Sequence, residues 1–264
     1  MQYFTSWKHP SVLRTMQPWD KEALSNWKDF ISLGLPGTLM LCSEWWAYEI
    51  LTFFASQLGT LEVGAQTIIL QTAGLAFMVP LGLGIASTSL VGNALGAGKT
   101  ESAIRFGKLA LGTIVVLEIF LGFCIYFGGR YFVDIFTSDP GVRAVAIKIM
   151  PFLSLFAMID GLQGVSSGIL RGGGKQSIGA VLNVISFYTI GLPMAWLLCF
   201  RTSLEVRGLM IGISCGTGFQ VVAVLSLILC FEKYVYRRAT PDAKDLTIEL
   251  DSSEGTQNEM IELR

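Results

Sequence analysis

The sequence separates apolar and charged residues into alternating blocks, and this separation limits the folds open to the chain. Six long apolar stretches contain no Lys or Arg and only four acidic residues. Each can cross the roughly 30 Å hydrocarbon layer of a bilayer as a helix, which takes about 20 residues. The pattern predicts an all-α, polytopic membrane protein, and it argues against a soluble enzyme and against a β-barrel of short alternating strands. The stretches are 30–57, 66–91, 109–127, 149–170, 178–200 and 208–231.

The polar segments around these stretches predict three parts and an orientation. Residues 1–29 form an N-terminal segment, residues 30–231 a six-helix transmembrane lobe, and residues 232–264 a flexible, acidic tail. An even number of spans places both ends on one side, and Lys and Arg are concentrated there. We therefore expect both termini in the cytoplasm. The opposite side has only five basic residues: Arg130, Arg143, Lys148, Arg201 and Arg207.

Several functions are disfavoured by composition. The net charge of −1 gives no sign of nucleic-acid binding. The single histidine, His9, and five cysteines without metal-type spacing predict no metal site, and we expect no cofactor. An intramembrane aspartyl protease needs two facing aspartates, but Asp160 is the only Asp in any stretch. We therefore expect no catalytic residues and no enzyme.

Three acidic residues lie at the middle of apolar stretches: Glu44, Glu118 and Asp160. A charged carboxylate at this depth is costly, so such residues usually face a cavity and mark a pathway. None of the six stretches contains a basic partner. The compensating charge must be a proton, a metal cation, an organic cation or a group on another chain. Glu44 and Asp160 are the stronger candidates, because Glu118 has no polar or aromatic neighbours in sequence.

Polar and aromatic residues around Glu44 leave two interpretations open. Glu49 lies five residues later, about 140° around an ideal helix, so it would line the cavity edge or face the outer surface. Trp45, Trp46 and Tyr48 would either anchor the helix at the lipid interface or form an aromatic wall that attracts organic cations.

Small residues and prolines predict how the helices meet. Glycines spaced by four residues allow close helix contacts in lipid, and prolines inside spans usually kink them. The segment Gly92–Thr100 reads GNALGAGKT, but the first glycine of a phosphate-binding loop would fall on Asn93. We interpret it as a glycine turn followed by an amphipathic link, Thr100–Lys108. The glycines are Gly164, Gly168, Gly172, Gly208, Gly212 and Gly216, and the prolines are Pro36, Pro80 and Pro193.

Three motifs, in this order, resemble those of the multidrug and toxin extrusion (MATE) transporters, particularly the vertebrate type. Glu44–Glu49 reads EWWAYE, and Val91–Gly98 reads VGNALGAG. Leu170–Gly179 reads LRGGGKQSIG and is followed by GLP at Gly191–Pro193. The resemblance extends from about Trp19 to Phe231.

The resemblance implies a transporter of twelve core helices in two pseudo-symmetric six-helix lobes, which exchanges organic cations for protons or sodium. This chain is similar to the second lobe, so the first six-helix lobe would be a missing partner. Acidic residues of the family fall on Glu44 and Asp160, and Glu49 matches an acid of the vertebrate relatives. Gln71 stands where those relatives carry a glutamate, which removes a cation-attracting charge.

The expected function is therefore a lobe of a secondary active antiporter in the plasma membrane, which exports organic cations or drug-like molecules in exchange for protons. The alternative is a half-transporter that does not transport but binds or modulates a full-length partner. The candidate substrate- and proton-binding residues are Glu44, Asp160, Glu49, Gln71, Trp46, Tyr48, Asn183 and Tyr188.

Overall fold

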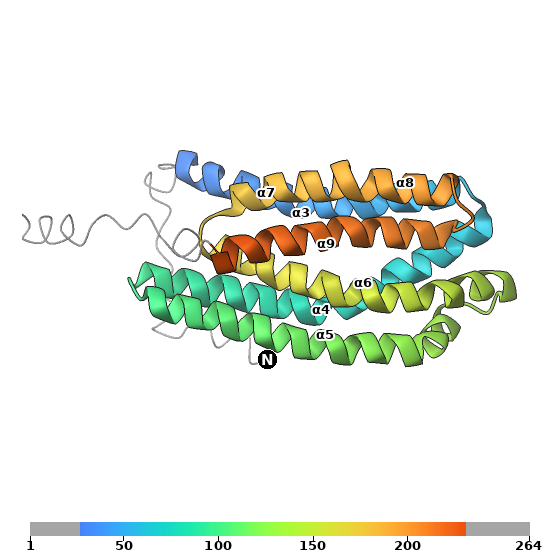
Figure 1. Ribbon diagram of the computed structural model, residues 1–264, viewed down its shortest axis with the longest axis horizontal. Helices are drawn as coiled ribbons and strands as arrows, with labels where there is room; N and C mark the ends of the chain where they lie inside the picture. The colour runs from blue at the N-terminus through green and yellow to red at the C-terminus, as the bar shows by residue number, and fades with distance from the viewer. Residues whose placement is uncertain (1–26, 231–264) are drawn as a thin grey trace, which may run out of the picture.

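The computed structural model describes residues 27–230, which form a bundle of long helices joined by short turns (Figure 1). No strand occurs among these residues. The predicted tail 232–264 and nearly all of the predicted segment 1–29 lie outside them. The helices are α3 (Trp27–Ser56), α4 (Thr60–Gly96), α5 (Thr100–Phe136), α6 (Pro140–Gly172), α7 (Gln176–Val184), the π-helix η2 (Ile185–Gly191), α8 (Leu192–Phe200) and α9 (Val206–Cys230).

Five helical stretches in the described part of the chain are long and apolar enough to cross a membrane. They are α4, α5, α6, the continuous run from α7 through α8, and α9, which confirms five of the six predicted spans. The sixth, α3, is 30 residues long and runs beside the others in Figure 1. It is less apolar because it contains Glu44, Glu49 and the adjacent Trp45 and Trp46. The all-α membrane fold is thus as predicted.

The turn between α4 and α5 is shorter than expected. α4 ends at Gly96, and Gly98 adopts a φ of 71°, a left-handed conformation that glycine accepts without strain. α5 then begins at Thr100. The predicted amphipathic link, Thr100–Lys108, therefore forms the first turns of α5 and continues directly into the third span.

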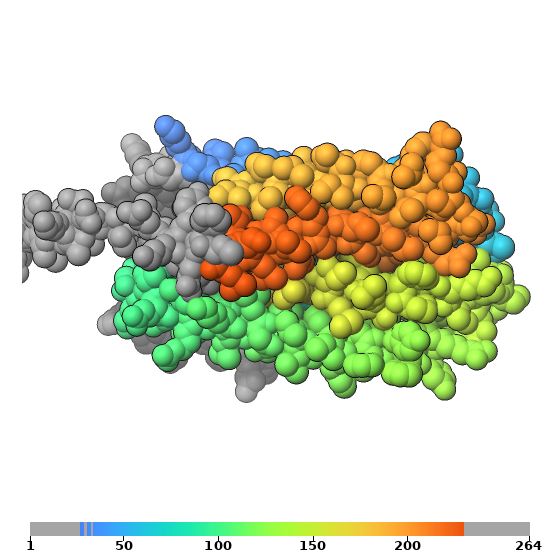
Figure 2. All heavy atoms as spheres, in the orientation of Figure 1, coloured from blue at the N-terminus to red at the C-terminus, as the bar shows by residue number. Residues whose placement is uncertain are grey.

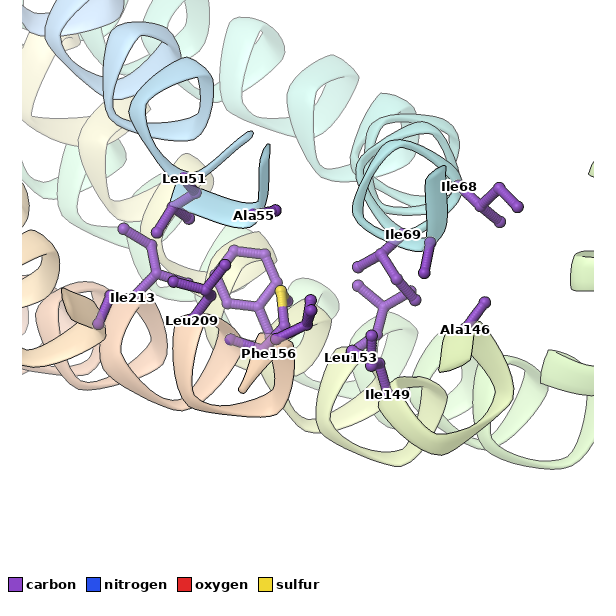
Figure 3. Close-up of a cluster of buried hydrophobic side chains, with 14 of the residues drawn as sticks. Leu51, Ala55, Ile68, Ile69, Ala146, Ile149, Leu153, Phe156, Leu209 and Ile213 are labelled. Atoms are coloured by element: carbon purple, nitrogen blue, oxygen red, sulfur yellow. The ribbon is translucent and has the colours of Figure 1, made fainter. Parts of the chain in front are cut away.

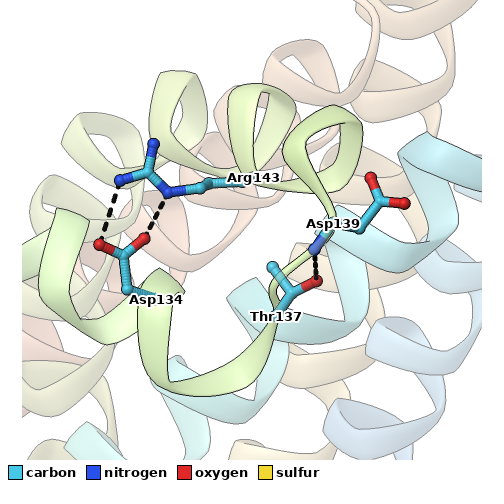
Figure 4. A network of polar contacts seen from close by, with 4 residues as sticks. All are labelled: Asp134, Thr137, Asp139 and Arg143. Atoms are coloured by element: carbon cyan, nitrogen blue, oxygen red, sulfur yellow. Dashed lines mark hydrogen bonds and ion pairs between the residues drawn. The ribbon is translucent and has the colours of Figure 1, made fainter.

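At the opposite end of the bundle, a polar corner joins α5 to α6 (Figure 4). Asp139 caps α6 by accepting hydrogen bonds from the amides of Gly141 and Val142 at 2.7 and 2.9 Å. Arg143 donates from two guanidinium nitrogens to both carboxylate oxygens of Asp134. The cap satisfies amides that have no partner inside the helix, and it fixes where α6 begins.

α6 packs closely against α4 along a seam of small residues. A Cβ atom added at Gly168 would lie 2.4 Å from the carbonyl oxygen of Gly84, closer than real side chains approach. Thr88 bridges the helices, because its hydroxyl donates to the Gly168 carbonyl oxygen at 2.8 Å. The first predicted glycine set therefore lies at a helix contact, where the backbones approach too closely for larger residues.

The second glycine set, on α9, packs against η2 and α8. A Cβ atom at Gly212 would lie 2.2 Å from the Cα atom of Ala195, and one at Gly216 would lie 2.4 Å from the Ser186 carbonyl oxygen.

On the face shown in Figure 2, α7, α8 and α9 form the upper part of the surface and hide most of α3.

The π-helix between α7 and α8 has a local cause in the sequence. Pro193 has no amide hydrogen and its ring would clash with the carbonyl of residue 189 in a regular α-helix. The wider turns of Ile185–Gly191 absorb this mismatch, and α8 then continues from Leu192. Pro193 thus produces a local change of helix type.

The apolar core lies where α3, α4, α6 and α9 meet (Figure 3). Phe156 of α6, Leu51 of α3 and Leu209 of α9 are each at most 2% exposed. This core holds α3 against α6 and so fixes the positions of the acidic residues in both helices.

Candidate functional site

Glu44 of α3 and Asp160 of α6 are brought together inside the bundle, with only 8% and 6% of their surfaces exposed. They lie close enough for their charges to interact. Tyr48 donates a hydrogen bond to Asp160 Oδ1 at 3.2 Å, and Gln163 Nε2 donates to Glu44 Oε2 at 3.4 Å. The two carboxylates are thus contacted by neutral donors.

The charge of this pair is not balanced by these donors. A hydrogen bond from a phenol or an amide stabilises a carboxylate less than an ion pair does. Arg171, in the last turn of α6, also acts electrostatically on Glu44. The predicted fourth span ends at residue 170, but α6 continues to Gly172 and so includes Arg171. It lies eight residues beyond Gln163, about 12 Å along the helix axis, so it is at the end of α6, away from the pair.

Tyr48 belongs to the site, whereas Trp46 does not contact these carboxylates. The Tyr48 ring packs edge-on against Phe156 and Phe187, with ring centroids 6.2 Å apart in both cases. Trp45 and Trp46 are 53% and 58% exposed, on the outer surface of α3. Tyr48 is thus partly buried beside the carboxylates, and the two tryptophans are on the outside of α3.

Glu49 and Gln71 are also exposed on the surface of the described bundle. Glu49 follows Glu44 by five residues and points away from the buried pair, as the helical angle suggests. Gln71 lies on α4, which contacts α6 on the side of the glycine seam. The two residues are therefore separate from the buried carboxylate pair.

Asn183 and Tyr188 hold α3 in place. The Asn183 amide donates to the Met40 carbonyl oxygen at 2.6 Å, and the Tyr188 hydroxyl donates to the Ser43 carbonyl oxygen at 3.1 Å. Gln220 of α9 in turn donates to the Asn183 side chain. These bonds tie α7, η2 and α9 to the turn of α3 just before Glu44, so both residues position the site.

Gln163 and Gln220 were not among the predicted site residues. Gln163 lies three residues after Asp160, a spacing that places two side chains on one face of a helix. This spacing could have identified it. Gln220 has no such local signal, because its partner Asn183 lies on a different helix.

Glu118, the weaker candidate, is buried as well, with 3% of its surface exposed. Its carboxylate lies against Gly161 of α6, next to Asp160 along the chain. Both Glu118 and Asp160 line one small pocket between α4, α5 and α6. The structure thus places all three mid-span acids in neighbouring positions around α6.

The chain matches the MatE family model over residues 36–197. It is 37% identical over 211 residues to multidrug and toxin extrusion protein 1 of Homo sapiens, covering 80% of this chain and 37% of that protein. The zebrafish (Danio rerio) protein of the same name is 35% identical over 249 residues, covering 92% of this chain and 42% of the relative.

The chain belongs to the MATE family. The crystal structure of the eukaryotic MATE transporter AtDTX14 superimposes with a TM-score of 0.81 at 31% identity, covering 89% of this chain and 53% of that one. The outward-facing conformation of a multidrug resistance MATE family transporter, at 22% identity, superimposes with a TM-score of 0.74 and supports the fold alone. This MATE chain therefore spans about two fifths of the length of its curated relatives and about half of the solved transporter. The family is one of multi-pass membrane transporters.

Proposed function

We propose that this chain is the second six-helix lobe of a MATE-type antiporter, which exports organic cations or drug-like molecules in exchange for protons. The observation that supports this most directly is the buried Glu44–Asp160 pair, whose contacting donors are neutral. Two carboxylates at this depth need a positive charge, and a proton or an organic cation can supply it in turn. Sodium is the alternative coupling ion.

The rest of the proposal follows from the family and from the charge pattern. The names of the curated relatives refer to extrusion of drugs and toxins, which agrees with a carboxylate site beside an aromatic ring. The distribution of Lys and Arg favours cytoplasmic termini, and we propose the plasma membrane as the location. The parts 1–29, 30–231 and 232–264 remain our proposed organisation of the chain, with no enzymatic activity.

Exchange requires a partner lobe. Alternating access in transporters with repeated halves involves movement of one half against the other around a shared site. We therefore expect the functional assembly to contain a first six-helix lobe in addition to this one.

The experiment is uptake of a fluorescent organic cation into vesicles that carry a pH gradient. The chain is reconstituted alone and together with the first lobe of a MATE relative. Uptake with both lobes that collapses with the pH gradient would support the proposal. Uptake driven only by a sodium gradient would replace the proton by sodium. If no uptake occurs under either condition and the chain co-purifies with a full-length transporter, the modulating half-transporter is favoured instead.

Glu44→Gln tests the carboxylate pair directly. Because protons and organic cations compete for one carboxylate, cation affinity should rise with pH and then level off, and this dependence should weaken in the variant. Glu44→Asp keeps the charge but shortens the side chain, so it should bind cations more weakly and still respond to pH. If Glu44→Gln binds cations with the full pH response, Glu44 is not the carrier.

A further inference from the structure

Glu118 lies at the centre of α5, eighteen residues from either end of the helix. At 1.5 Å per residue, it is about 27 Å from both ends. The residues around it on the outer face of α5 are apolar and exposed, such as Val116 and Phe120 at 68% and 65%. Glu118 itself is buried and therefore points into the bundle.

The carboxylate of Glu118 occupies space that a side chain at position 161 would need. A Cβ atom added at Gly161 would lie 1.7 Å from Glu118 Oε1, so the oxygen lies directly against the α6 backbone. Within the described part of the chain, Oε1 has no hydrogen-bond partner. Leaving a buried carboxylate charged and without a partner is costly.

A pocket connects Glu118 to Asp160. Both acids line it, and its remaining walls are apolar, including Phe77 and Pro80 of α4 and Phe156 of α6. The lining residues of α4 carry no charge, so the charged group that faces Glu118 from the helices packed on α5 is Asp160 of α6. Asp160 in turn interacts with Glu44 of α3.

We propose that Glu118 is a further proton-binding residue of this lobe, in addition to the Glu44–Asp160 pair, and that it exchanges its proton with Asp160 across the pocket they share. From the sequence, Glu118 was the weakest of the three mid-span acids. Its burial, its unpartnered oxygen and its position against Gly161 all point to a neutral, protonated acid. Ionisation of Asp160 places a like charge beside Glu118 and so couples the protonation of the two groups. Only the role of Glu118 in transport rests on the proposed function; its binding of a proton does not.

The direct test is infrared titration of protonated carboxyl groups in the purified full chain without organic cation, comparing the unchanged chain with Glu118→Gln. The difference between them should contain the signal of one carboxyl group that gains its proton as the pH falls. This readout is independent of transport, so a failure of the proposed exchange function leaves it interpretable. An identical titration in both proteins would overturn the proposal.

Two further variants keep the test decisive. Gly161→Ala retains Glu118 but places a methyl group where its oxygen lies, so the Glu118 signal should shift in pH. Asp134→Asn changes an exposed acid at the end of the same helix and should leave the Glu118 signal in place. If Glu118→Gln fails to fold by thermal unfolding, Gly161→Ala alone decides, and an unshifted signal overturns the proposal.

The last measurement tests whether the pocket binds sodium instead of a proton. Sodium chloride is compared with potassium chloride at constant pH and ionic strength. Loss of the Glu118 proton signal in sodium alone would show that the pocket binds a small inorganic cation, which would overturn its assignment as a proton site. In a transporting two-lobe assembly, Glu118→Gln should release fewer protons per organic cation bound, with cation binding retained.

Discussion

Beside the apolar core, α6 meets α4 at a seam of bare backbone, whereas it meets α3 through a set of polar side chains. At the α4 seam, Gly168 approaches Gly84 so closely that no side chain fits. At the α3 contact, Tyr48 reaches Asp160 and Gln163 reaches Glu44 through hydrogen bonds. Both kinds of contact join helices in lipid, where the hydrophobic effect between them is absent.

The difference separates a rigid part of the lobe from a part that can change its charge. Packing at the glycine seam depends on shape, so its stability should not respond to pH. The carboxylate contact depends on charge, because a proton on Asp160 removes the negative charge that attracts the Tyr48 hydroxyl and a bound cation. The seam therefore holds α6 in place, while Asp160, one turn before Gly164 on the same helix, can gain and lose a proton.

The largest expected effect is that of Asp160→Asn on exchange. The amide nearly keeps the shape of the carboxylate but binds neither a proton nor a cation by charge. We expect pH-driven exchange of the two-lobe assembly to be abolished while the chain unfolds at nearly the same temperature. Asp134→Asn, an exposed acid on α5, is the matched control and should exchange normally. Unchanged pH-dependent exchange by Asp160→Asn would contradict the role of the site.

The second effect is steric. Gly168→Ala places a Cβ atom 2.4 Å from the Gly84 carbonyl oxygen and should destabilise the lobe by about 1–3 kcal/mol, as overpacking does. The same change at Gly112, where nothing lies within 4 Å, should stabilise α5 slightly through its better helix propensity, by about 0.5–1 kcal/mol. Thermal unfolding in detergent at two pH values measures both. If the loss of stability in Gly168→Ala varies with pH, packing at the glycine seam is not independent of the charged site.

Much of this division could be predicted from the sequence. The mid-span positions of Glu44 and Asp160 marked them, because isolated acids in apolar stretches are costly. The glycine spacing on α6 likewise indicated a close contact. Two features were beyond reach. The pairing of Glu118 with Gly161 depends on the rotation of α5 against α6, which periodicity alone does not fix.

The second feature that the sequence did not predict is the extent of the π-helix η2. Pro193 signalled a disturbance of the helix, but the sequence did not show that seven residues, Ile185–Gly191, would form a π-helix. A missing hydrogen bond can be absorbed as a kink or as a wider turn. In the structure, Gly216 of α9 packs against Ser186 of this segment, a contact between distant residues that the local sequence does not reveal.

A smaller effect is expected for Tyr48→Phe. The ring and its edge-on contacts with Phe156 and Phe187 remain, and only the hydrogen bond to Asp160 is lost. A single hydrogen bond contributes about 0.5–1.5 kcal/mol, so cation affinity should change by roughly threefold to tenfold. The pH at which binding responds should move with it. Fluorescence titration across pH measures both quantities, and a change in affinity without any change in the pH response would mean that Tyr48 contacts the cation but not the carboxylate.

The smallest effect is expected for Gln71→Glu, which tests whether charge far from the buried pair matters. The resemblance to vertebrate relatives suggests that a glutamate here attracts cations, but Gln71 is exposed on α4 of the described lobe. Exposed charges interact weakly with one another, by about 0.2–1 kcal/mol, and salt screens them. Gln71→Glu should therefore tighten organic-cation binding by at most about fivefold at low salt, and the gain should vanish at high salt. Glu49→Gln, which removes an exposed acid from α3, should weaken binding by a similar factor with the same salt dependence. A gain at Gln71→Glu that persists at high salt would place this position in direct contact with the cation, and the buried pair would then be only part of a longer binding surface.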